Sequence, residues 1–442
     1  MLETILSKSQ KAAIAGVSLV VVAGCSGNSS SPGTSGGSSS GSSSSSGSHA
    51  TNGSTRSTKG HTGGTSSSSS GTNSSSGGST GSTSSSGSTS GGVIQLATLP
   101  DQINALTIVG ANLYWVDLTH GIMKLPVTGG TPTMVLSDAS IDGNLATDGT
   151  LLYFTSTPMG ATASTLMSVG LSGSVETTLA TGFIAANNTG LVGTTASVSS
   201  LATQLFIVGG QAYLNALIMA GGNARETLIS IPTSAGGTAT DLFASLSNSA
   251  VGIQDLAWAD SSGLYFENDD GSIATGPEVY LGYAPLTGGT ISQLWVPTTG
   301  YVMGTTYFEP VGGELALSGG SAYFIARPHG EEAPGTLTSL TLFDAVPPTG
   351  PASAVQTYPT EAVCGVVSDT HGTFMVEGGV PPGQNGAIFA VDPSTGAQTM
   401  AYTPDFNGYV TPYTNVLDAH NLYFQMILPN QLNGFALYAL PR

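Results

Sequence analysis

Between Val93 and Arg442 the chain repeats one pattern of apolar and polar positions seven times. Each copy holds a short apolar run, a turn of Gly, Asp or Asn, an aromatic position, a second apolar run and a turn containing Gly or Pro. Short runs that alternate with a period of two between such turns are typical of β-strands, and these turn residues suit tight hairpins. The aromatic positions are Leu113-Tyr114-Trp115, Leu152-Tyr153-Phe154, Ala212-Tyr213-Leu214, Leu264-Tyr265-Phe266, Ala322-Tyr323-Phe324, Thr373-Phe374-Met375 and Leu422-Tyr423-Phe424. The pattern predicts a series of antiparallel units.

The spacing of these units predicts the fold. Successive aromatic positions lie roughly 40 to 60 residues apart, the period of a four-stranded propeller blade. Third strands are expected at 122–125, 166–169, 228–231, 280–283, 340–343, 388–391 and 435–440. Fourth strands are expected at 134–136, 179, 242–243, 294–295, 355–358 and 400–402. We therefore expect an all-β, seven-bladed β-propeller over 93–442; six blades are the alternative if the poorly matching third repeat is irregular.

The last repeat ends at Arg442, directly after its third strand. The apolar segment 94–97, ahead of the first inner strand, has the right character to supply the missing fourth strand. The two ends of the repeat region would then share one blade and close the ring, which removes open sheet edges.

The first repeat carries a family resemblance. Tyr114-Trp115-Val116-Asp117, with Ile122 and Gly129-Gly130 downstream, resembles the YWTD repeat of receptor propellers and, more loosely, NHL-type blades. Later repeats lack the Asp after the aromatic pair. The resemblance implies a propeller, although those families typically have six blades.

Residues 1–24 read as a leader. Lys8 and Lys11 precede an apolar stretch at 12–23, which fits the core of a signal peptide and is too short to span a bilayer. The closing Val22-Ala23-Gly24-Cys25 resembles a bacterial lipobox, which implies cleavage before Cys25 and its diacylation; the alternative is a secreted protein cut elsewhere. Ser26 follows the Cys, and the absence of Asp there implies the outer membrane.

Residues 25–92 form the second segment, which after Cys25 is almost wholly Ser, Gly and Thr. This composition holds too little apolar surface to offset the entropy of ordering, so a disordered linker is predicted. As a Gly/Ser coil it has a root-mean-square reach of roughly 45 Å.

Charge excludes one class of partner. Charged residues make up 8% of the chain, the net charge is -18, and the only cations of 93–442 are Lys124, Arg225, Arg327 and Arg442. Binding nucleic acid needs several clustered cations, so nucleic acid is excluded. Residues 93–442 contain no nucleophile elbow, zinc helix or phosphate loop, and we predict no catalytic residue, cofactor or metal. Cys364 is interpreted as a free, buried thiol.

In propellers the loops between strands two and three, and those that enter the inner strands, gather on one face around the channel. On the predicted register this candidate ligand face contains Asp117, His120, Glu267, Asp269, Asp270, Arg327 and His329. The acidic run 267–271 leaves a loose calcium site as an alternative. His371 and His420 fall in inner turns at the opposite face, where we expect a role in turn structure.

These features predict a monomeric cell-envelope lipoprotein, held in the outer membrane by lipid on Cys25, on the periplasmic or cell-surface side. Its propeller would be a binding or scaffolding module for a protein or glycan. The alternative is a polysaccharide-acting enzyme, a glycosidase or lyase, with acids and His329 on the channel face. A glycosidase requires two carboxyl groups about 5 to 10 Å apart in a pocket. A purely structural envelope component is a third possibility.

We predict that Cys25→Ala releases the protein from membranes, because acyl chains contribute about 0.8 kcal/mol per buried methylene and two chains hold a protein stably. The measurement is detergent-phase partitioning together with incorporation of labelled fatty acid. Ser26→Ala is the matched control and should partition like the wild type. Unchanged partitioning of Cys25→Ala would refute lipid anchoring.

Overall fold

The computed structural model describes residues 92–442 except 118, 159–160, 162, 174, 186–203, 221–222, 245–251, 270–278, 296–300, 304–314, 319, 329–339, 346–351, 359–362, 378–385, 405–408 and 429–433. The predictions made for residues 1–91, including the leader, Cys25 and most of the linker, lie outside this part. Every regular element of the described residues is a β-strand. Among them no helix has the length and apolar character needed to cross a membrane.

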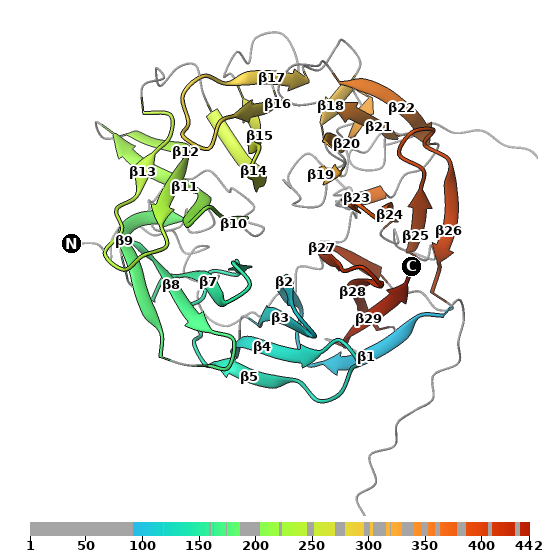
Figure 1. Ribbon diagram of the computed structural model, residues 1–442, viewed down its shortest axis with the longest axis horizontal. Helices are drawn as coiled ribbons and strands as arrows, with labels where there is room; N and C mark the ends of the chain where they lie inside the picture. Colours follow the sequence, from blue (N-terminus) through green and yellow to red (C-terminus); the bar gives the residue numbers. More distant parts are fainter. Residues whose placement is uncertain are drawn as a thin grey trace, which may run out of the picture. The chain divides into compact units, whose positions relative to one another are not determined.

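The strands form seven blades around a central axis, as Figure 1 shows. Blade 1 contains β2 (Ile103–Val109), β3 (Asn112–Asp117), β4 (Gly121–Pro126) and β5 (Thr133–Leu136). Blade 2 contains β6 (Ala146–Thr147), β7 (Leu151–Ser156), β8 (Ser164–Gly170) and β9 (Thr177–Ala185). Blade 3 contains β10 (Leu205–Val208), β11 (Gln211–Ala220), β12 (Asn223–Pro232) and β13 (Thr240–Asp241). Blade 4 contains β14 (Gly252–Asp260), β15 (Gly263–Asp269), β16 (Val279–Ala284) and β17 (Ser292–Trp295).

The remaining blades follow the same order from the axis outward. Blade 5 contains β18 (Tyr301–Met303) and β19 (Leu315–Ser318), which both pair with β20 (Ser321–Pro328), then β21 (Leu340–Ala345) and β22 (Ser353–Tyr358). Blade 6 contains β23 (Val363–Asp369), β24 (Gly372–Glu377), β25 (Ala387–Val391) and β26 (Gln398–Tyr402). Blade 7 contains β27 (Tyr409–Leu417), β28 (Asn421–Ile427), β29 (Phe435–Pro441) and, from the start of the fold, β1 (Ile94–Leu99). The chain is therefore a seven-bladed β-propeller, and the six-bladed alternative is wrong.

All described strand pairs are antiparallel. Hairpin turns join the first two strands of a blade, and Gly209 and Gly210 both take positive φ angles of 56° and 77° in the turn of blade 3, as a tight hairpin requires. Blades 2 and 3 merge into one sheet because the end of β9 also pairs with β11, with Ala185 opposite Ala216. One predicted strand is misplaced: β13 ends at Asp241, so the expected strand at 242–243 lies just beyond it.

The predicted closure of the ring is confirmed. β1 pairs with β29 from Ile94 opposite Ala439 to Leu99 opposite Phe435, and the two labels lie side by side in Figure 1. Leu96 and Leu99 are buried in one cluster with Trp115 of blade 1. The first strand of the fold thus contributes both a ladder and apolar contacts to the last blade.

The aromatic positions explain how the blades join. Neighbouring residues of a strand face opposite sides of its sheet. Tyr114 therefore packs with Leu152 and Phe154 of blade 2, whereas Trp115 packs with Tyr423 of blade 7. The residues that face the following blade are Tyr114, Tyr153, Tyr213, Tyr265, Tyr323, Phe374 and Tyr423. Those that face the preceding blade are Trp115, Phe154, Leu214, Phe266, Phe324, Met375 and Phe424. Seven buried clusters thus fill the seven interfaces.

Deleting 93–99 should lower the melting temperature by about 10 °C or more. The deletion removes one ladder and the burial of Leu96 and Leu99, each worth about 2 kcal/mol. The measurement is thermal unfolding by circular dichroism. Deleting seven linker residues, 70–76, is the matched control and should leave the melting curve in place. An unchanged curve for the 93–99 deletion would show that β1 does not hold the ring closed.

Candidate functional site

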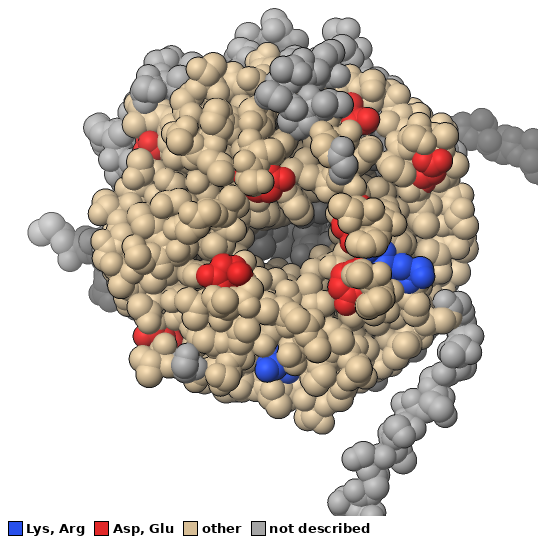
Figure 2. Space-filling view, viewed as in Figure 1, with Lys and Arg blue, Asp and Glu red and all other residues tan. Residues whose placement is uncertain are grey.

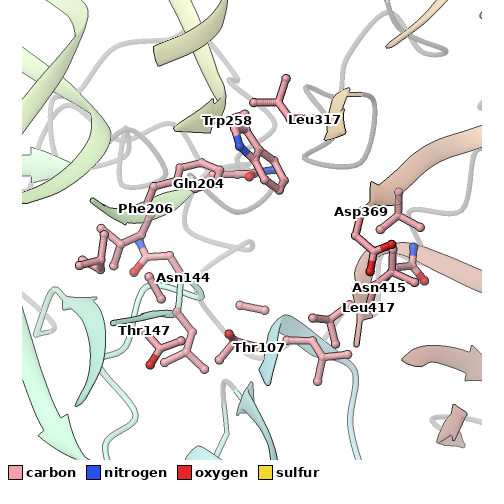
Figure 3. A pocket seen from close by; sticks show the side chains of 18 of the residues that line it. Thr107, Asn144, Thr147, Gln204, Phe206, Trp258, Leu317, Asp369, Asn415 and Leu417 are labelled. Carbon is pink, nitrogen blue, oxygen red and sulfur yellow. The ribbon is translucent and has the colours of Figure 1, made fainter. Parts of the chain in front are cut away.

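The inner strands of all seven blades surround a cavity of about 640 Å³ at the centre of the ring (Figure 3). Its wall includes residues of β2, β6, β10, β14, β19, β23 and β27. Cavities of this size commonly hold small ligands, provided that a few polar groups converge among apolar ones. The cavity is therefore the first place to search for a binding site.

Several inner strands do not pair regularly along their length. On β2 the register shifts between Ile103 and Leu106, and on β27 it shifts between Thr411 and Val416. In blade 2 an isolated bridge at Ile141 precedes the ladder that starts at Ala146. Extra residues at such shifts bend a strand and re-aim its side chains.

Amide side chains of the cavity wall lie at these irregular points. Asn104 and Asn415 fall within the two register shifts, and Asn144 falls between the bridge of blade 2 and its ladder. In blade 3 Gln204 directly precedes β10, whose pairing with β11 starts at Leu205. The interruptions of the inner strands thus supply polar groups to a wall that is otherwise mainly apolar.

Several polar groups of the wall already have partners. Asn144 is held by Thr155, since its amide donates to Thr155 Oγ1 at 2.7 Å and its carbonyl oxygen accepts from Thr155 N at 2.8 Å. The Thr147 hydroxyl donates to the Leu151 carbonyl at 2.8 Å, and the Ser368 hydroxyl pairs with that of Thr373 at 2.7 Å. These hydrogen bonds hold the side chains in place and stabilise the wall.

Other polar groups of the wall have no partner among the described residues. Trp258 Nε1 is a buried donor without an acceptor, and the side chains of Asn104, Thr107 and Gln204 make no hydrogen bond within that part of the chain. The Trp258 ring lies against Phe206, with ring centroids 5.7 Å apart and planes tilted by 51°. Figure 3 shows Trp258, Gln204 and Phe206 close together on one side of the cavity. An aromatic corner with unused hydrogen-bonding groups is the most distinctive part of the site.

Aspartates mark the turns at which several inner strands end. Asp148 accepts hydrogen bonds from the backbone N–H groups of Thr150 and Leu151, each at 2.8 Å, and from the Tyr153 hydroxyl at 2.8 Å. Burial alone would raise the pKa of Asp148, but these hydrogen bonds lower it to about 2. Burial and the contact with Asp148 raise the pKa of Tyr153 to about 12.

The same arrangement recurs in blade 7, where Asp418 accepts from the N–H groups of His420 and Asn421, each at 2.7 Å, and from the Tyr423 hydroxyl at 2.8 Å. In blade 4 Asp260 accepts from the N–H of Ser262 at 2.8 Å. His420 therefore has the predicted role in turn structure. On the face drawn in Figure 2, acidic side chains surround the central opening.

Blade 6 departs from this arrangement because Phe374 stands where blades 2 and 7 have Tyr. Asp369 still accepts from the N–H of His371 at 2.8 Å, but its carboxylate is held mainly by Arg442, with two contacts of 2.6 Å. The Arg442 guanidinium also donates to the Asp418 carbonyl at 2.8 Å and lies 5.4 Å from the centre of the Phe374 ring. Hydrogen bonds from Arg442 lower the pKa of Asp369 to about 2. Arg442 thus links blades 6 and 7 and neutralises an acid of the cavity wall.

Two of the predicted site residues meet at the other end of the blades. Asp117 is buried at the end of β3, and its Oδ2 lies 2.9 Å from His120 Nδ1. Asp101 joins them, because Thr119 Oγ1 donates to Asp117 Oδ1 at 2.7 Å and lies 3.0 Å from Asp101 Oδ2. Burial would raise the pKa of Asp117, but hydrogen bonds from Thr119 and His120 lower it. The hydrogen bond to Asp117 raises the pKa of His120.

Ligand atoms of Asp101, Asp117 and His120 lie within 4.8 Å of one another, close enough for one metal ion. Hydrogen bonds among these residues and Thr119 account for the arrangement without an ion, and none of them lines the cavity. Asp101 was not among the residues predicted for the site. It lies between β1 and β2, and only the fold brings it to Asp117.

The other predicted residues are not brought together by the described structure. Glu267 and Asp269 lie within β15 rather than in a loop, paired with β14 and β16, and Arg327 lies within β20 opposite Val302. Their side chains, with the whole of Asp270 and His329, lie outside the described residues. The cavity residues were also missed, and the only signal for them was an amide shortly before or within several inner apolar runs.

Solved structures that resemble the chain share little sequence with it. No family model matches the chain, and no curated protein matches it. A solved oligogalacturonate lyase in complex with manganese is 12% identical, with 75% of this chain and 86% of that chain covered and a TM-score of 0.49. The β-propeller domain of the Trilobed protease from Pyrococcus furiosus is 7% identical, with 77% and 95% covered and a TM-score of 0.48. BamB from Moraxella catarrhalis is 10% identical, with 79% and 99% covered and a TM-score of 0.42.

Acid should destabilise the protein between about pH 4 and pH 2. Asp148 and Asp369 have pKa values of about 2 when folded, below the value of about 3.9 expected when unfolded, so their stabilising effect is complete above pH 4 and lost as the pH falls towards 2. Arg442→Gln should lower the melting temperature at pH 7 by roughly 2 °C, and less at pH 2. Thermal melts at pH 7, 4 and 2 measure both effects.

The matched control for this experiment is Lys124→Gln. Lys124 lies 5.5 Å from the centre of the Tyr114 ring and forms no ion pair with a described carboxylate, so its difference from the wild type should not depend on pH in this range. If the difference caused by Arg442→Gln is equally independent of pH, the ion pair with Asp369 does not stabilise the fold.

Proposed function

We propose that this protein is a cell-envelope lipoprotein whose propeller is a binding or scaffolding module for a protein or glycan. In this proposal residues 1–24 are removed and Cys25 carries the lipid. Residues 26–92 form the linker. Residues 93–442 form a monomeric binding domain that is tethered to the outer membrane, on its periplasmic or cell-surface side. The leader and the linker composition support the location, and the closed ring supports a monomer because it leaves no blade interface uncovered.

The observation that carries a binding function is the central cavity. Its wall combines apolar side chains with unused polar groups, and its one ionisable lining residue among those described, Asp369, is held by Arg442. Such a cavity offers apolar contact area and directional hydrogen bonds to a ligand. Among the described residues of its wall there is no free acid or base for proton transfer.

The enzyme alternative requires paired carboxyl groups. A glycosidase needs an acid and a base or nucleophile about 5 to 10 Å apart beside the bound sugar. Asp101 and Asp117 are close enough, but they share the hydroxyl of Thr119 and do not line the cavity. The described geometry therefore favours binding over hydrolysis.

We expect Thr107→Trp to abolish capture of envelope material by the protein. Thr107 lines the cavity and is partly exposed, so an indole there would fill space that a ligand needs. The measurement is mass spectrometry and sugar analysis of material that co-purifies with the full-length protein from cell envelopes. Thr181→Trp, an exposed position on the outer strand β9, is the matched control and should retain the material.

Melting curves verify that both variants fold. If Thr107→Trp unfolds early, Gln204→Trp tests the same space from another blade. Retention of the same material by a folded variant with a filled cavity would show that the cavity is not the binding site.

A further inference from the structure

We propose that the central cavity binds a neutral, hydroxyl-rich ligand, a short uncharged oligosaccharide segment, with Trp258 and Gln204 as its main hydrogen-bonding partners. This inference deepens the proposed function and rests on it. It follows from three properties of the wall: the hydrogen-bonding groups that have no partner among the described residues, the electrostatics, and an aromatic corner beside an amide.

The unused groups both donate and accept hydrogen bonds. Trp258 Nε1–H is a donor only, whereas the Asn104 and Gln204 amides and the Thr107 hydroxyl can do both. Sugar hydroxyls also donate and accept, so a single ring can satisfy several of these groups. Buried donors without acceptors are rare in native proteins, and a ligand oxygen near Trp258 Nε1 would complete this one.

The electrostatics of the described wall disfavour anionic ligands. No free cation lines the described wall, and Arg442 is already held by Asp369 and the Asp418 carbonyl. Asp148 and Asp260 end inner strands that border the cavity, and Figure 2 shows acidic side chains around the central opening. A cleft rimmed by charges of one sign repels ligands of that sign. A ligand without charge enters with no such penalty.

One side of the cavity is aromatic. Trp258 and Phe206 form an aromatic corner beside Gln204, and Asp369, Asn415 and Leu417 lie across the cavity from it in Figure 3. A pyranose ring combines apolar C–H faces with polar hydroxyl edges. Aromatic rings provide large apolar contact areas, and the amide beside them provides direction. The arrangement thus suits a sugar ring placed against the aromatic corner.

The test uses the full-length protein, purified from membranes in detergent, on an array of oligosaccharides. The array carries neutral hexose and N-acetylhexosamine oligosaccharides, uronic-acid and sulfated oligosaccharides, and short uncharged peptides. We expect binding to members of the neutral sugar group. Titration calorimetry with the best neutral sugar then gives the affinity of each variant.

Two variants remove single partners and keep the shape of the wall. Trp258→Phe removes the Nε1–H donor and retains a ring against Phe206, and Gln204→Leu removes the amide at similar size. Each should weaken sugar binding about tenfold, the usual effect of losing one hydrogen bond to a ligand. Gln293→Leu, on the exposed outer strand β17, makes the same exchange away from the cavity and should bind like the wild type.

Several outcomes would overturn the inference. These are binding of the anionic sugars alone, binding of the peptides alone, no binding on the array, or neutral-sugar binding that neither Trp258→Phe nor Gln204→Leu weakens in folded protein. The proposed function fails separately, since it requires that envelope material is lost when Thr107→Trp fills the cavity. If Thr107→Trp loses that material and the array shows binding to peptides, the proposed binding function stands and the proposed sugar ligand is wrong.

Discussion

The ring depends on the pair of large side chains at the centre of the second strand of each blade. Because neighbouring residues of a strand face opposite sides of the sheet, Tyr114 and Trp115 reach both adjacent blades at once. A blade on its own would leave both apolar faces in water, and stacking buries them only between neighbours. The last face finds a partner only when blade 7 meets blade 1, which makes closure by β1 a requirement of the whole core.

Because the second strands form the interfaces between blades, the inner strands can vary in their pairing. Each inner strand pairs on one side with the second strand of its blade, and its other edge faces the axis. Extra residues at Asn104 or Asn144 therefore interrupt one ladder without disturbing the clusters that the second strands pack. Such interruptions are a usual way to re-aim side chains. Here they bring amides to the axis. Irregular pairing of the inner strands, which does not disturb the core, thus contributes to the wall of the cavity.

The fold could be predicted from the sequence because its signal repeats, whereas the site could not. The strand expected at 242–243 was wrong because Phe243 is apolar for another reason: its side chain is buried between blades 3 and 4. Its backbone N–H donates to the Asp241 carboxylate in a turn. Asp101 reaches Asp117 only through the fold, so no local motif marks the pair. Wall amides such as Asn104 and Asn415 lie at register shifts, and no local motif in the sequence marks where these shifts occur.

The electrostatics of the site follow from how the chain uses its acids. Asp148 and Asp418 are saturated by their own turns, and Asp369 lacks a tyrosine partner because Phe374 replaces it. Arg442 fills that role and lies in contact with blades 6 and 7 at once. Asp369 is thus neutralised by Arg442, whereas the carboxylates of Asp148 and Asp418 keep their charge while hydrogen bonds occupy their lone pairs. They act on a ligand at long range by repulsion and not by contact, which leaves recognition inside the cavity to neutral groups.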